Sequence, residues 1–439
     1  RYAELRREAL AGTDDEGGEK AAAGVDDELE TTQKSASLRS KSDSGLESTM
    51  ASAAPESQSP EEIERAIATR KRLTRFALVA AAGTGLVFLL MELVWYRMLS
   101  PLLGGSSYTF GLILAVALFG IGTGGLLYNW RDATPTVAGF GLTCALEALF
   151  MAVPFALGDR VALLAMFLRS MGSVGLAGHA IAWTVVTAVV VLPAAIVAGY
   201  QFPLLIALLG QAREAIGRHV GLAYAFNTGG AIAGSLMGGF FSLPVIGALG
   251  AWRVTVWLVI ALGLGAMYVH AGGEKARRPL IAPLVACVLT AMCLHLPMGP
   301  TAVWRHAPIG AGRADDIVQN ATRNSLRQSF HDRRRGITWE TDGRESAIGL
   351  YTLNDTSFLV NGKSDGAAVI DSGTQVMGGL VVALMQPKPG KRALVIGLGT
   401  GSTAGWLAAL PDIEQVDVVE LEPAIVEVAR VCTPVTHGV

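Results

Sequence analysis

The chain has few charged residues and few cysteines for its length. Of its 439 residues 16% are charged and 51% are hydrophobic, and the mean hydropathy is +0.43. This balance is far too apolar for a soluble protein of this size, so composition predicts a membrane protein. The four cysteines are scattered, and their spacing predicts neither a disulfide framework nor a zinc site. We therefore expect no metal cofactor.

The N-terminal segment has almost no aromatic residues. Residues 1–60 are rich in Glu, Asp, Ser, Ala and Gly, and Tyr2 is the single aromatic side chain. This composition offers too little apolar surface to offset the entropy lost on ordering. We predict a disordered arm over residues 1–70. The chain shows no secretory signal peptide, because its first apolar run is long and internal.

Residues 71–298 form the most apolar part of the chain. They contain about seven runs of the length that crosses a hydrocarbon core, which is roughly 20 residues. We predict a multi-pass helical domain in a cell membrane, with the bilayer as its partner. The expected spans are 76–96, 107–129, 136–157, 179–209, 219–246, 251–271 and 279–298.

Basic residues set up a conflict over orientation. They gather before the first span and in every second loop, at Arg65, Arg70, Lys71, Arg72, Arg75, Arg131, Arg213, Arg218, Lys275, Arg277 and Arg278. The positive-inside rule makes these loops cytoplasmic. Seven spans would then place everything after residue 298 outside the cytoplasm. We favour a cytoplasmic C-terminal domain, which requires one miscounted or re-entrant span, and residues 160–178 are the expected place for it.

A few polar residues lie inside the predicted spans. Glu92 has two open interpretations: an acid in a span suggests function, yet Glu92 lies near the span's end with Arg97 in reach. Glu147, His179 and Asn227 are interpreted as hydrogen-bonded packing residues. Glycines repeat at every fourth place from Gly120 and from Gly230, a pattern that predicts close helix packing.

The chain regains soluble character after residue 298. Residues 299–336 are basic and polar and are interpreted as a linker. Alternating apolar residues from 337 to 360 predict two or three antiparallel strands in a subdomain spanning 337–370, with a turn at Asn354 and Asp355. A helix is expected from about 372 to 386, where Pro387 ends it.

A glycine-rich turn is the most informative motif. Gly397, Gly399 and Gly401 follow an apolar run that predicts a buried strand, and they precede a helix. A second apolar strand ends at Glu420, where a carboxylate can accept hydrogen bonds from ribose hydroxyls. This pair of half-motifs predicts a nucleoside cofactor site. The looser dinucleotide pattern GxGxxA also fits, but we favour an S-adenosylmethionine type of site over NAD.

The segment from Trp304 to Arg430 resembles the spermidine synthase family, in its bacterial form fused to a membrane domain. The resemblance rests on Trp339–Tyr351, on Leu359–Gly366, on Asp371–Gln375 and on the glycine turn, in that order. It implies a multi-pass α-helical membrane domain, a small β-hairpin subdomain and, over 371–439, the start of an α/β Rossmann-like domain of the S-adenosylmethionine-dependent transferase type.

The resemblance also implies roles for individual residues. The donor would be decarboxylated S-adenosylmethionine, or S-adenosylmethionine, and the acceptor a polyamine. Polyamine binding would fall on Gln375, Asp371 and Asp365. Donor binding would fall on the following residues: Gly397, Gly399, Thr400, Gly401, Glu420 and Glu422.

Three departures from the family pattern leave the function open. Thr400 stands where soluble members carry an Asp that contacts the donor, and Val395 stands where many methyltransferases carry an acid. The family's general base would lie beyond Val439, so no catalytic residue is assigned here and we expect this chain, which looks like a fragment, to be inactive.

The first hypothesis is a membrane-bound aminopropyltransferase of polyamine biosynthesis. The alternatives are a transporter or sensor with a non-catalytic adenosyl-binding domain, and a methyltransferase. We expect no nucleic-acid partner, and a homo-oligomer is compatible with the sequence.

Overall fold

The computed structural model describes residues 59–131, 134–209, 216–271, 281–310, 312, 322–388 and 390–436. Contacts divide the chain into two units, Arg1–Thr69 and Arg70–Val439, and the second contains nearly all of the helices and all of the strands given below. Of the predicted disordered arm, residues 1–58 lie outside the described residues, whereas its last residues from Pro60 form the start of a helix. Arg213, Lys275, Arg277 and Arg278 also lie outside the described residues.

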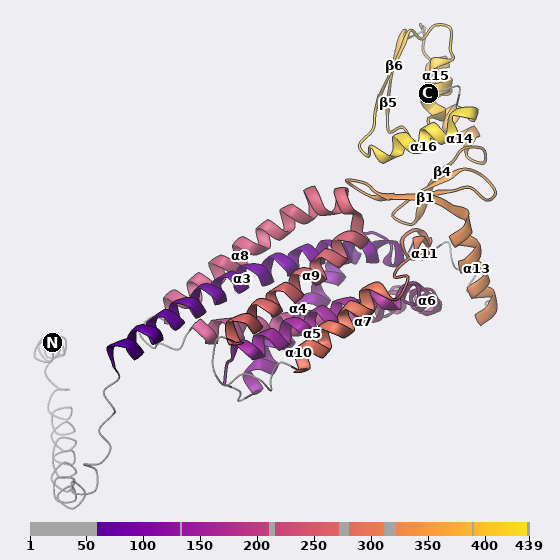
Figure 1. Ribbon diagram of the computed structural model, residues 1–439. Coiled ribbons are helices and arrows are strands. Elements are labelled where there is room, and N and C mark those ends of the chain that lie inside the picture. The colour runs from indigo at the N-terminus through magenta and orange to yellow at the C-terminus, as the bar shows by residue number, and fades with distance from the viewer. Residues whose placement is uncertain are drawn as a thin grey trace, which may run out of the picture. The chain divides into compact units, whose positions relative to one another are not determined.

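Long apolar helices make up the first part of the second unit (Figure 1). Their backbone groups are satisfied within each helix, which an apolar solvent requires. Two of them begin at hydroxyl caps, where Ser106 accepts from the Thr109 N–H at 3.4 Å and Thr136 from the Gly139 N–H at 3.0 Å. The helices are α3 (Pro60–Leu103), α4 (Ser107–Trp130), α5 (Val137–Leu157), α7 (Leu176–Leu209), α8 (Ile216–Met237), α9 (Leu243–Ala271) and α10 (Ile281–His295).

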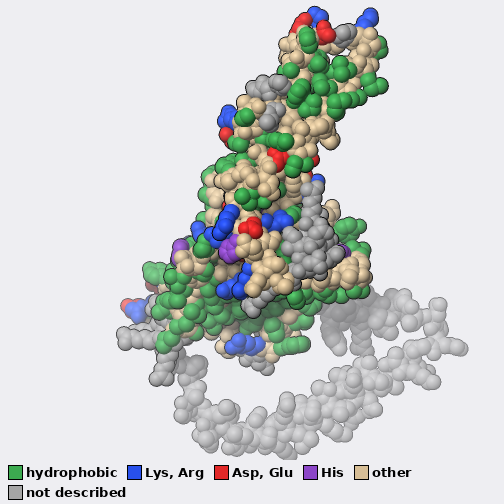
Figure 2. Space-filling view, turned by 90° about the vertical axis from the view of Figure 1, so that its right-hand side faces the viewer, with side chains coloured by type: hydrophobic (Ala, Val, Ile, Leu, Met, Phe, Trp, Pro, Cys, Tyr) green, Lys and Arg blue, Asp and Glu red, His purple; other side chains and the backbone are tan. Residues whose placement is uncertain are grey.

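Five helical stretches of the described residues are long and apolar enough to cross a membrane, whereas the sequence predicted about seven. They are Ile67–Leu103, Ser107–Trp130, Val137–Leu157, Leu176–Leu209 and Gly217–His270. The last stretch holds two predicted spans, and the seventh predicted span forms only the 15-residue helix α10. Hydrophobic side chains cover much of the helical part in Figure 2, as a hydrocarbon environment requires.

The stretch Gly217–His270 is not one straight helix. It contains a π-helical turn, η4 (Gly238–Ser242), and a break at Gly247, whose φ of 70° and ψ of 171° lie outside the helical region. Both arms pack on neighbouring positions of α3, because a Cβ on Gly230 would meet Ala82 and a Cβ on Gly83 would meet Leu262. The chain therefore reverses direction at Gly247.

The glycine repeats pack helices together as predicted. A Cβ on Gly124 of α4 would lie 1.9 Å from the Ile196 oxygen of α7, and one on Gly234 of α8 would lie 2.1 Å from the Leu86 oxygen of α3. Glu147 accepts a 2.7 Å hydrogen bond from Gln201 Nε2, and Asn227 donates to the Ala81 oxygen at 3.0 Å. Both residues thus serve helix packing, as expected. Glu92 is half-buried in α3, and both interpretations of it stay open.

Residues 160–178, the expected place of a miscounted span, form no membrane-crossing helix. They fold as α6 (Asp159–Leu168), which has 10 residues, and the short 3-10 helix η2 (Arg169–Val174). The predicted linker also has structure, namely α11 (Ala302–His306) and α13 (Arg323–Gly336).

Four antiparallel strands follow in the order β1-β2-β3-β4; three of them lie between 337 and 360, where two or three were predicted, and β4 lies beyond that range. They are β1 (Ile337–Asp342), β2 (Ala347–Tyr351), β3 (Ser357–Val360) and β4 (Lys363–Ala367). The β3–β4 hairpin turns at Asn361 and Gly362, with φ of 47° and 81°, the positive values that two-residue hairpin loops need. Asp355 lies in the β2–β3 turn, as predicted, and accepts from the Thr356 N–H at 2.7 Å.

The last part begins with α14 (Ser372–Leu384) and contains two parallel strands, β5 (Arg392–Ile396) and β6 (Gln415–Val419). They are joined through α15 (Ser402–Ala408) and followed by α16 (Ala424–Cys432). The sequence predicted that β5 is buried, and this is wrong: Leu394 is 64% exposed and Ile396 84%. The sheet of β5 and β6 has two strands. α14 and α15 pack against the face of β5 that is opposite to Leu394 and Ile396.

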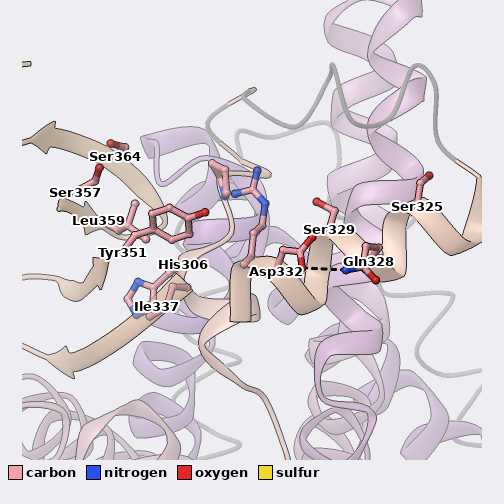
Figure 3. A pocket seen from close by; sticks show the side chains of 12 residues that line it. His306, Ser325, Gln328, Ser329, Asp332, Ile337, Tyr351, Ser357, Leu359 and Ser364 are labelled. Carbon is pink, nitrogen blue, oxygen red and sulfur yellow. Dashed lines mark hydrogen bonds between the residues drawn. The ribbon is translucent and has the colours of Figure 1, made fainter. Parts of the chain in front are cut away.

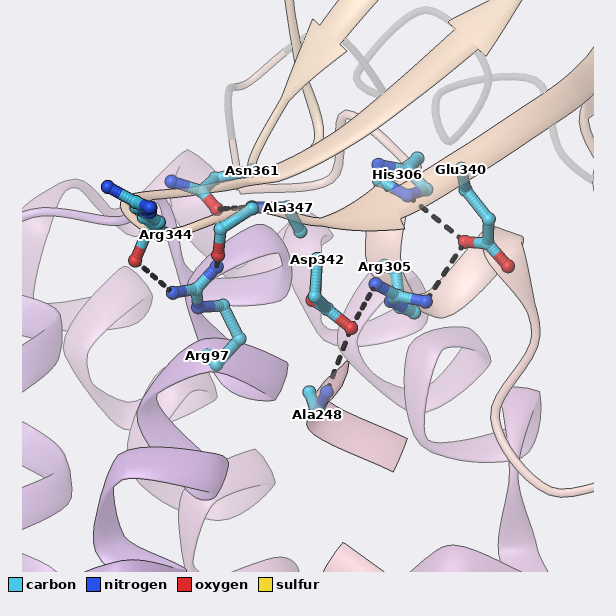
Figure 4. A network of polar contacts seen from close by, with 10 residues as sticks. Arg97, Ala248, Arg305, His306, Glu340, Asp342, Arg344, Ala347 and Asn361 are labelled. Carbon is cyan, nitrogen blue, oxygen red and sulfur yellow. Dashed lines mark hydrogen bonds and ion pairs between the residues drawn. The ribbon is translucent and has the colours of Figure 1, made fainter. Parts of the chain in front are cut away.

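A buried polar network joins β1 to the helices (Figure 4). Asp342 forms a 2.7 Å ion pair with Arg305 of α11 and accepts a 2.8 Å hydrogen bond from the Ala248 N–H at the bend of α9. Arg305 also lies 3.3 Å from Glu340. Arg97, near the end of α3, donates to the Gly343 and Arg344 oxygens at 3.3 and 3.2 Å.

His306 and Glu340 extend this network. Burial lowers the pKa of His306, although its hydrogen bond with Glu340 opposes this, and the two side chains lie 3.1 Å apart. Burial acts to raise the pKa of Glu340, but the contacts with His306 and the charge of Arg305 outweigh it and hold this pKa below its usual value. The favoured arrangement is therefore a neutral imidazole donating to a charged carboxylate.

Replacing Asp342 tests the importance of this network for stability. The side chains of Arg305 and Asp342 are 8% and 5% exposed, so Asp342→Asn would leave the buried guanidinium with its longer ion pair to Glu340 alone. Breaking a buried pair costs about 3–5 kcal/mol, and the remaining contact with Glu340 places the expected loss at the lower end. We expect a clear fall in the unfolding temperature of the full chain in detergent.

Lys363→Gln is the matched control. It breaks the Lys363–Asp365 ion pair, whose side chains are 61% and 35% exposed, and exposed pairs contribute less than about 1 kcal/mol. Equal losses of stability in the two variants would contradict the role given to the buried pair.

Candidate functional site

The glycine turn adopts a backbone that other residues rarely accept. Gly397, Gly399 and Gly401 have φ values of 90°, 57° and 84°. The Gly397 N–H donates to the Val419 oxygen at 2.8 Å, which holds the turn at the carboxyl end of both parallel strands. Ligands of α/β sheets bind at this edge. The turn therefore has the position and the open backbone of a ligand loop.

Glu420 lies against the glycine turn, where the sequence predicted it. Its Oε2 accepts from the Leu398 N–H at 2.7 Å and its Oε1 from the Glu422 N–H at 2.9 Å. The side chain is half-buried. A carboxylate has about four acceptor sites, so each oxygen can accept a further hydroxyl.

Glu422 has a position that the sequence did not indicate. It is 6% exposed, and its Oε2 accepts from the Glu345 and Ser346 N–H groups at 2.9 and 3.4 Å. Its Oε1 accepts from the Ala424 N–H at 3.2 Å, at the start of α16. Glu422 thus ties the β1–β2 turn to the segment after β6. The proximity of Gly343, where a Cβ would lie 2.2 Å from this carboxylate, leaves no room for a larger residue.

Thr400 and Gln375 bring two of the predicted motifs together. Thr400 is 2% exposed, and its hydroxyl bonds Gln375 Oε1 and, at 2.9 Å, the Ser402 hydroxyl. Gln375 Nε2 donates to the Ala367 oxygen of β4 at 3.3 Å. The Thr403 hydroxyl donates to the backbone oxygen of Gln375 at 2.7 Å. The glycine turn, α14 and β4 therefore meet at Gln375.

The two predicted acids are placed differently from each other. Asp371 accepts from the Ala367 N–H at 2.9 Å, so it shares the end of β4 with Gln375. Asp365 forms a 3.0 Å ion pair with Lys363. Within the described residues no contact joins Asp365 to the glycine turn.

Phe358 belongs to this site, and the sequence gave no reason to single it out. A Cβ on Gly399 would lie 3.7 Å from its ring, and one on Gly366 would lie 2.8 Å from it. Phe358 is 7% exposed and packs with Ile348, Leu350 and α16 residues. An aromatic residue in an alternating strand predicts a core position, and its approach to the turn depends on long-range packing.

A separate cavity of about 600 Å³ lies between α13 and the other face of the sheet (Figure 3). Its polar lining includes Arg333, Gln328, Tyr351 and several serines. Burial lowers the pKa of Arg333, against the influence of Tyr351. Gln328 Nε2 donates to Asp332 at 3.0 Å. The residues that line this cavity are not those predicted from the sequence as a ligand site.

Comparison with known proteins gives one relative. The chain is 27% identical over 388 residues to polyamine aminopropyltransferase 2 of Streptomyces coelicolor, and the match covers 84% of this chain and 62% of that protein. The chain thus spans less than two thirds of the relative's length. The match is longer than the part after residue 298, so it includes apolar helices. No family model matches the chain, and no solved structure matches it.

Thr400→Val tests the contact at the centre of the site. The change removes the hydroxyl that joins Gln375 and Ser402, and it leaves Gln375 Oε1 without that donor. An unsatisfied buried polar atom costs about 1–3 kcal/mol. We expect chemical denaturation of the full chain in detergent to show a loss of this size.

Thr338→Val provides the comparison, because Thr338 is exposed and bonds Thr352 at 3.3 Å on the surface. Surface changes of this kind stay within about 0.5 kcal/mol. If Thr400→Val were as mild as Thr338→Val, the hydroxyl of Thr400 would not hold the turn to α14.

Proposed function

We propose that the chain is a membrane-bound aminopropyltransferase of the spermidine synthase type, acting in polyamine biosynthesis. The observation that carries the proposal is the meeting of the glycine turn, α14 and β4 around Gln375, with Glu420 on the turn. These are the segments whose order resembles the family. The relative named polyamine aminopropyltransferase 2 supports the same activity.

The fold supports the proposal at the level of its parts. The parallel β5–α15–β6 unit, with a glycine turn after its first strand, is what the start of a Rossmann-like domain requires. We propose that this domain extends over residues 371–439 and that 337–370 form the hairpin subdomain. The five long apolar helices support attachment to a membrane.

The donor would be decarboxylated S-adenosylmethionine. In this proposal Gly397, Gly399 and Gly401 let the backbone approach the nucleoside, and Glu420 accepts hydrogen bonds from the ribose hydroxyls. Thr400 replaces an acid, and its hydroxyl is already used by Gln375 and Ser402. The amino end of the donor would therefore depend on residues other than Thr400.

The reaction needs a neutral amine beside the sulfonium group. The amine nitrogen attacks the methylene carbon of the aminopropyl group that is bound to sulfur. The bond between this carbon and sulfur breaks, and methylthioadenosine leaves with the bonding electrons. The amine loses a proton to a base. Asp371 and Gln375 are proposed to bind and orient the polyamine, which lowers the entropic part of the barrier. No described residue is assigned as the base.

A transporter or sensor is the second candidate. The described residues contain five helical stretches long and apolar enough to cross a membrane, more than an anchor needs, and position 400 carries Thr in place of an acid. In this case the glycine turn would bind an adenosyl ligand without turnover. A methyltransferase has less support, because Val395 occupies the place of the acid that many methyltransferases carry.

Calorimetric titration of the full chain in detergent tests the proposal. We expect decarboxylated S-adenosylmethionine to bind more tightly than the carboxylated donor. Glu420→Gln should weaken donor binding about tenfold or more. The carboxylate charge strengthens the hydrogen bonds from the ribose hydroxyls by about 1.4 kcal/mol, which corresponds to a tenfold change in affinity. The unfolding temperature of the variant should be recorded as well, because Glu420 also holds Leu398.

Glu414→Gln is the control. Glu414 is an exposed ion-pair partner of Lys391 and precedes β6, whereas Glu420 follows it. This variant should leave binding unchanged. Tighter binding of the carboxylated donor would favour methyl transfer, and binding of neither donor would contradict the proposed function.

A further inference from the structure

The strands lie at one end of the helical bundle. Trp304 Nε1 donates to the Met98 oxygen at 2.7 Å, and the Gly310 N–H donates to the Pro101 oxygen at 3.0 Å, so the chain after α10 meets the end of α3. The bond from Ala248 to Asp342 places the α8–α9 bend there too (Figure 4). We name this the strand end of the bundle.

The connection between α5 and α7 also stays at the strand end. Asp159, the first residue of α6, accepts from the backbone and the hydroxyl of Thr301 at 2.9 and 2.6 Å, which joins the start of α6 to the segment between α10 and α11. η2 and the start of α7 lie there too, because Arg169 of η2 and Trp183 of α7 line one small pocket with Leu102, at the end of α3. The chain leaves α5 and enters α7 without another crossing.

The remaining connections lie at the opposite end. The Arg72 guanidinium stacks 5.3 Å over the Tyr268 ring, so the start of α3 lies beside the end of α9. The rings of Phe76 and Phe140 are 6.0 Å apart, which adds the start of α5. This second end, which we name the basic end, therefore holds the starts of α3, α5, α8 and α10 and the ends of α4, α7 and α9.

Basic residues divide unequally between the two ends. The described residues at the basic end include six basic side chains, all exposed: Arg70, Lys71, Arg72, Arg75, Arg131 and Arg218. At the strand end, by contrast, Arg97, Arg253 and Arg305 are used in contacts within the protein, and of the two arginines between α5 and α7 Arg160 is exposed and Arg169 half-buried. The arginines of α13 begin well beyond the end of α10, outside the roughly 20 residues next to a span that set orientation.

We infer that the basic end faces the cytoplasm and that the strands, with the glycine turn, lie on the opposite side of the membrane. Lys and Arg in short loops fix orientation, and the basic loops remain cytoplasmic. The cytoplasmic location that we favoured from the sequence required a miscounted span at 160–178. The structure shows no such span, because α6 and η2 begin and end at the strand end.

This orientation has a consequence for ligand supply, which rests on the proposed function. A site outside the cytoplasm binds ligands of the outer compartment. The decarboxylation that forms the donor would have to be followed by export, or else the site binds amines and nucleosides that arrive from outside. The orientation itself depends on neither ligand.

Thiol labelling of intact cells tests the orientation in the full chain. Single cysteines are placed at Thr134, before α5 at the basic end, and at Asp412, in the exposed turn before β6, with the four native cysteines replaced by alanine. We expect a membrane-impermeant maleimide to label D412C in intact cells and T134C only after permeabilisation. Protection of D412C in intact cells would overturn the inference.

Reporter fusions to the native sequence keep the test decisive if the cysteine-free protein does not fold. A phosphatase that is active only outside the cytoplasm should be active when inserted after Asp412 and inactive when inserted after Thr134. The reverse pattern would overturn the inference. Neither readout depends on donor binding, so a failure of the orientation and a failure of the proposed function can be told apart.

Discussion

The ion pair between Arg305 and Asp342 fixes how the strands meet the helices. Asp342 is the last residue of β1, and its carboxylate also accepts from Ala248, at the bend where the chain reverses between α8 and α9. A buried carboxylate requires such donors, and a buried guanidinium requires such an acid. The position of β1, and with it the sheet on which the candidate site is built, depends on this requirement.

Two carboxylates near the end of β6 have different roles at the site. Glu420 receives the Leu398 N–H from the glycine turn and keeps acceptor capacity for a ligand. Glu422, two residues later, is enclosed by backbone donors from the β1–β2 turn and from the start of α16. The sequence placed both in the donor site, but their surroundings differ because burial and the number of N–H donors differ.

Short-range patterns made the apolar helices, the glycine turn and the place of Glu420 at the end of β6 predictable, whereas Gln375 was singled out by the family resemblance alone and its contact with the turn was not predicted. The sequence separated the spans 219–246 and 251–271 at the place where the chain reverses. It could not show the contact of that bend with Asp342 or the short helix α6, because each depends on distant residues. The prediction of a buried β5 failed for a related reason. An apolar run is buried only where another layer covers it, and Leu394 and Ile396 have no such cover among the described residues.

Hydrogen exchange of the full chain, measured with and without decarboxylated S-adenosylmethionine, tests the central claim that the glycine turn is a nucleoside site. The account predicts slower exchange of the amides from Gly397 to Gly401 and of the residues beside Glu420 when the ligand is present. Unchanged exchange at this turn, with protection confined to the helices or to the cavity beside α13, would contradict it.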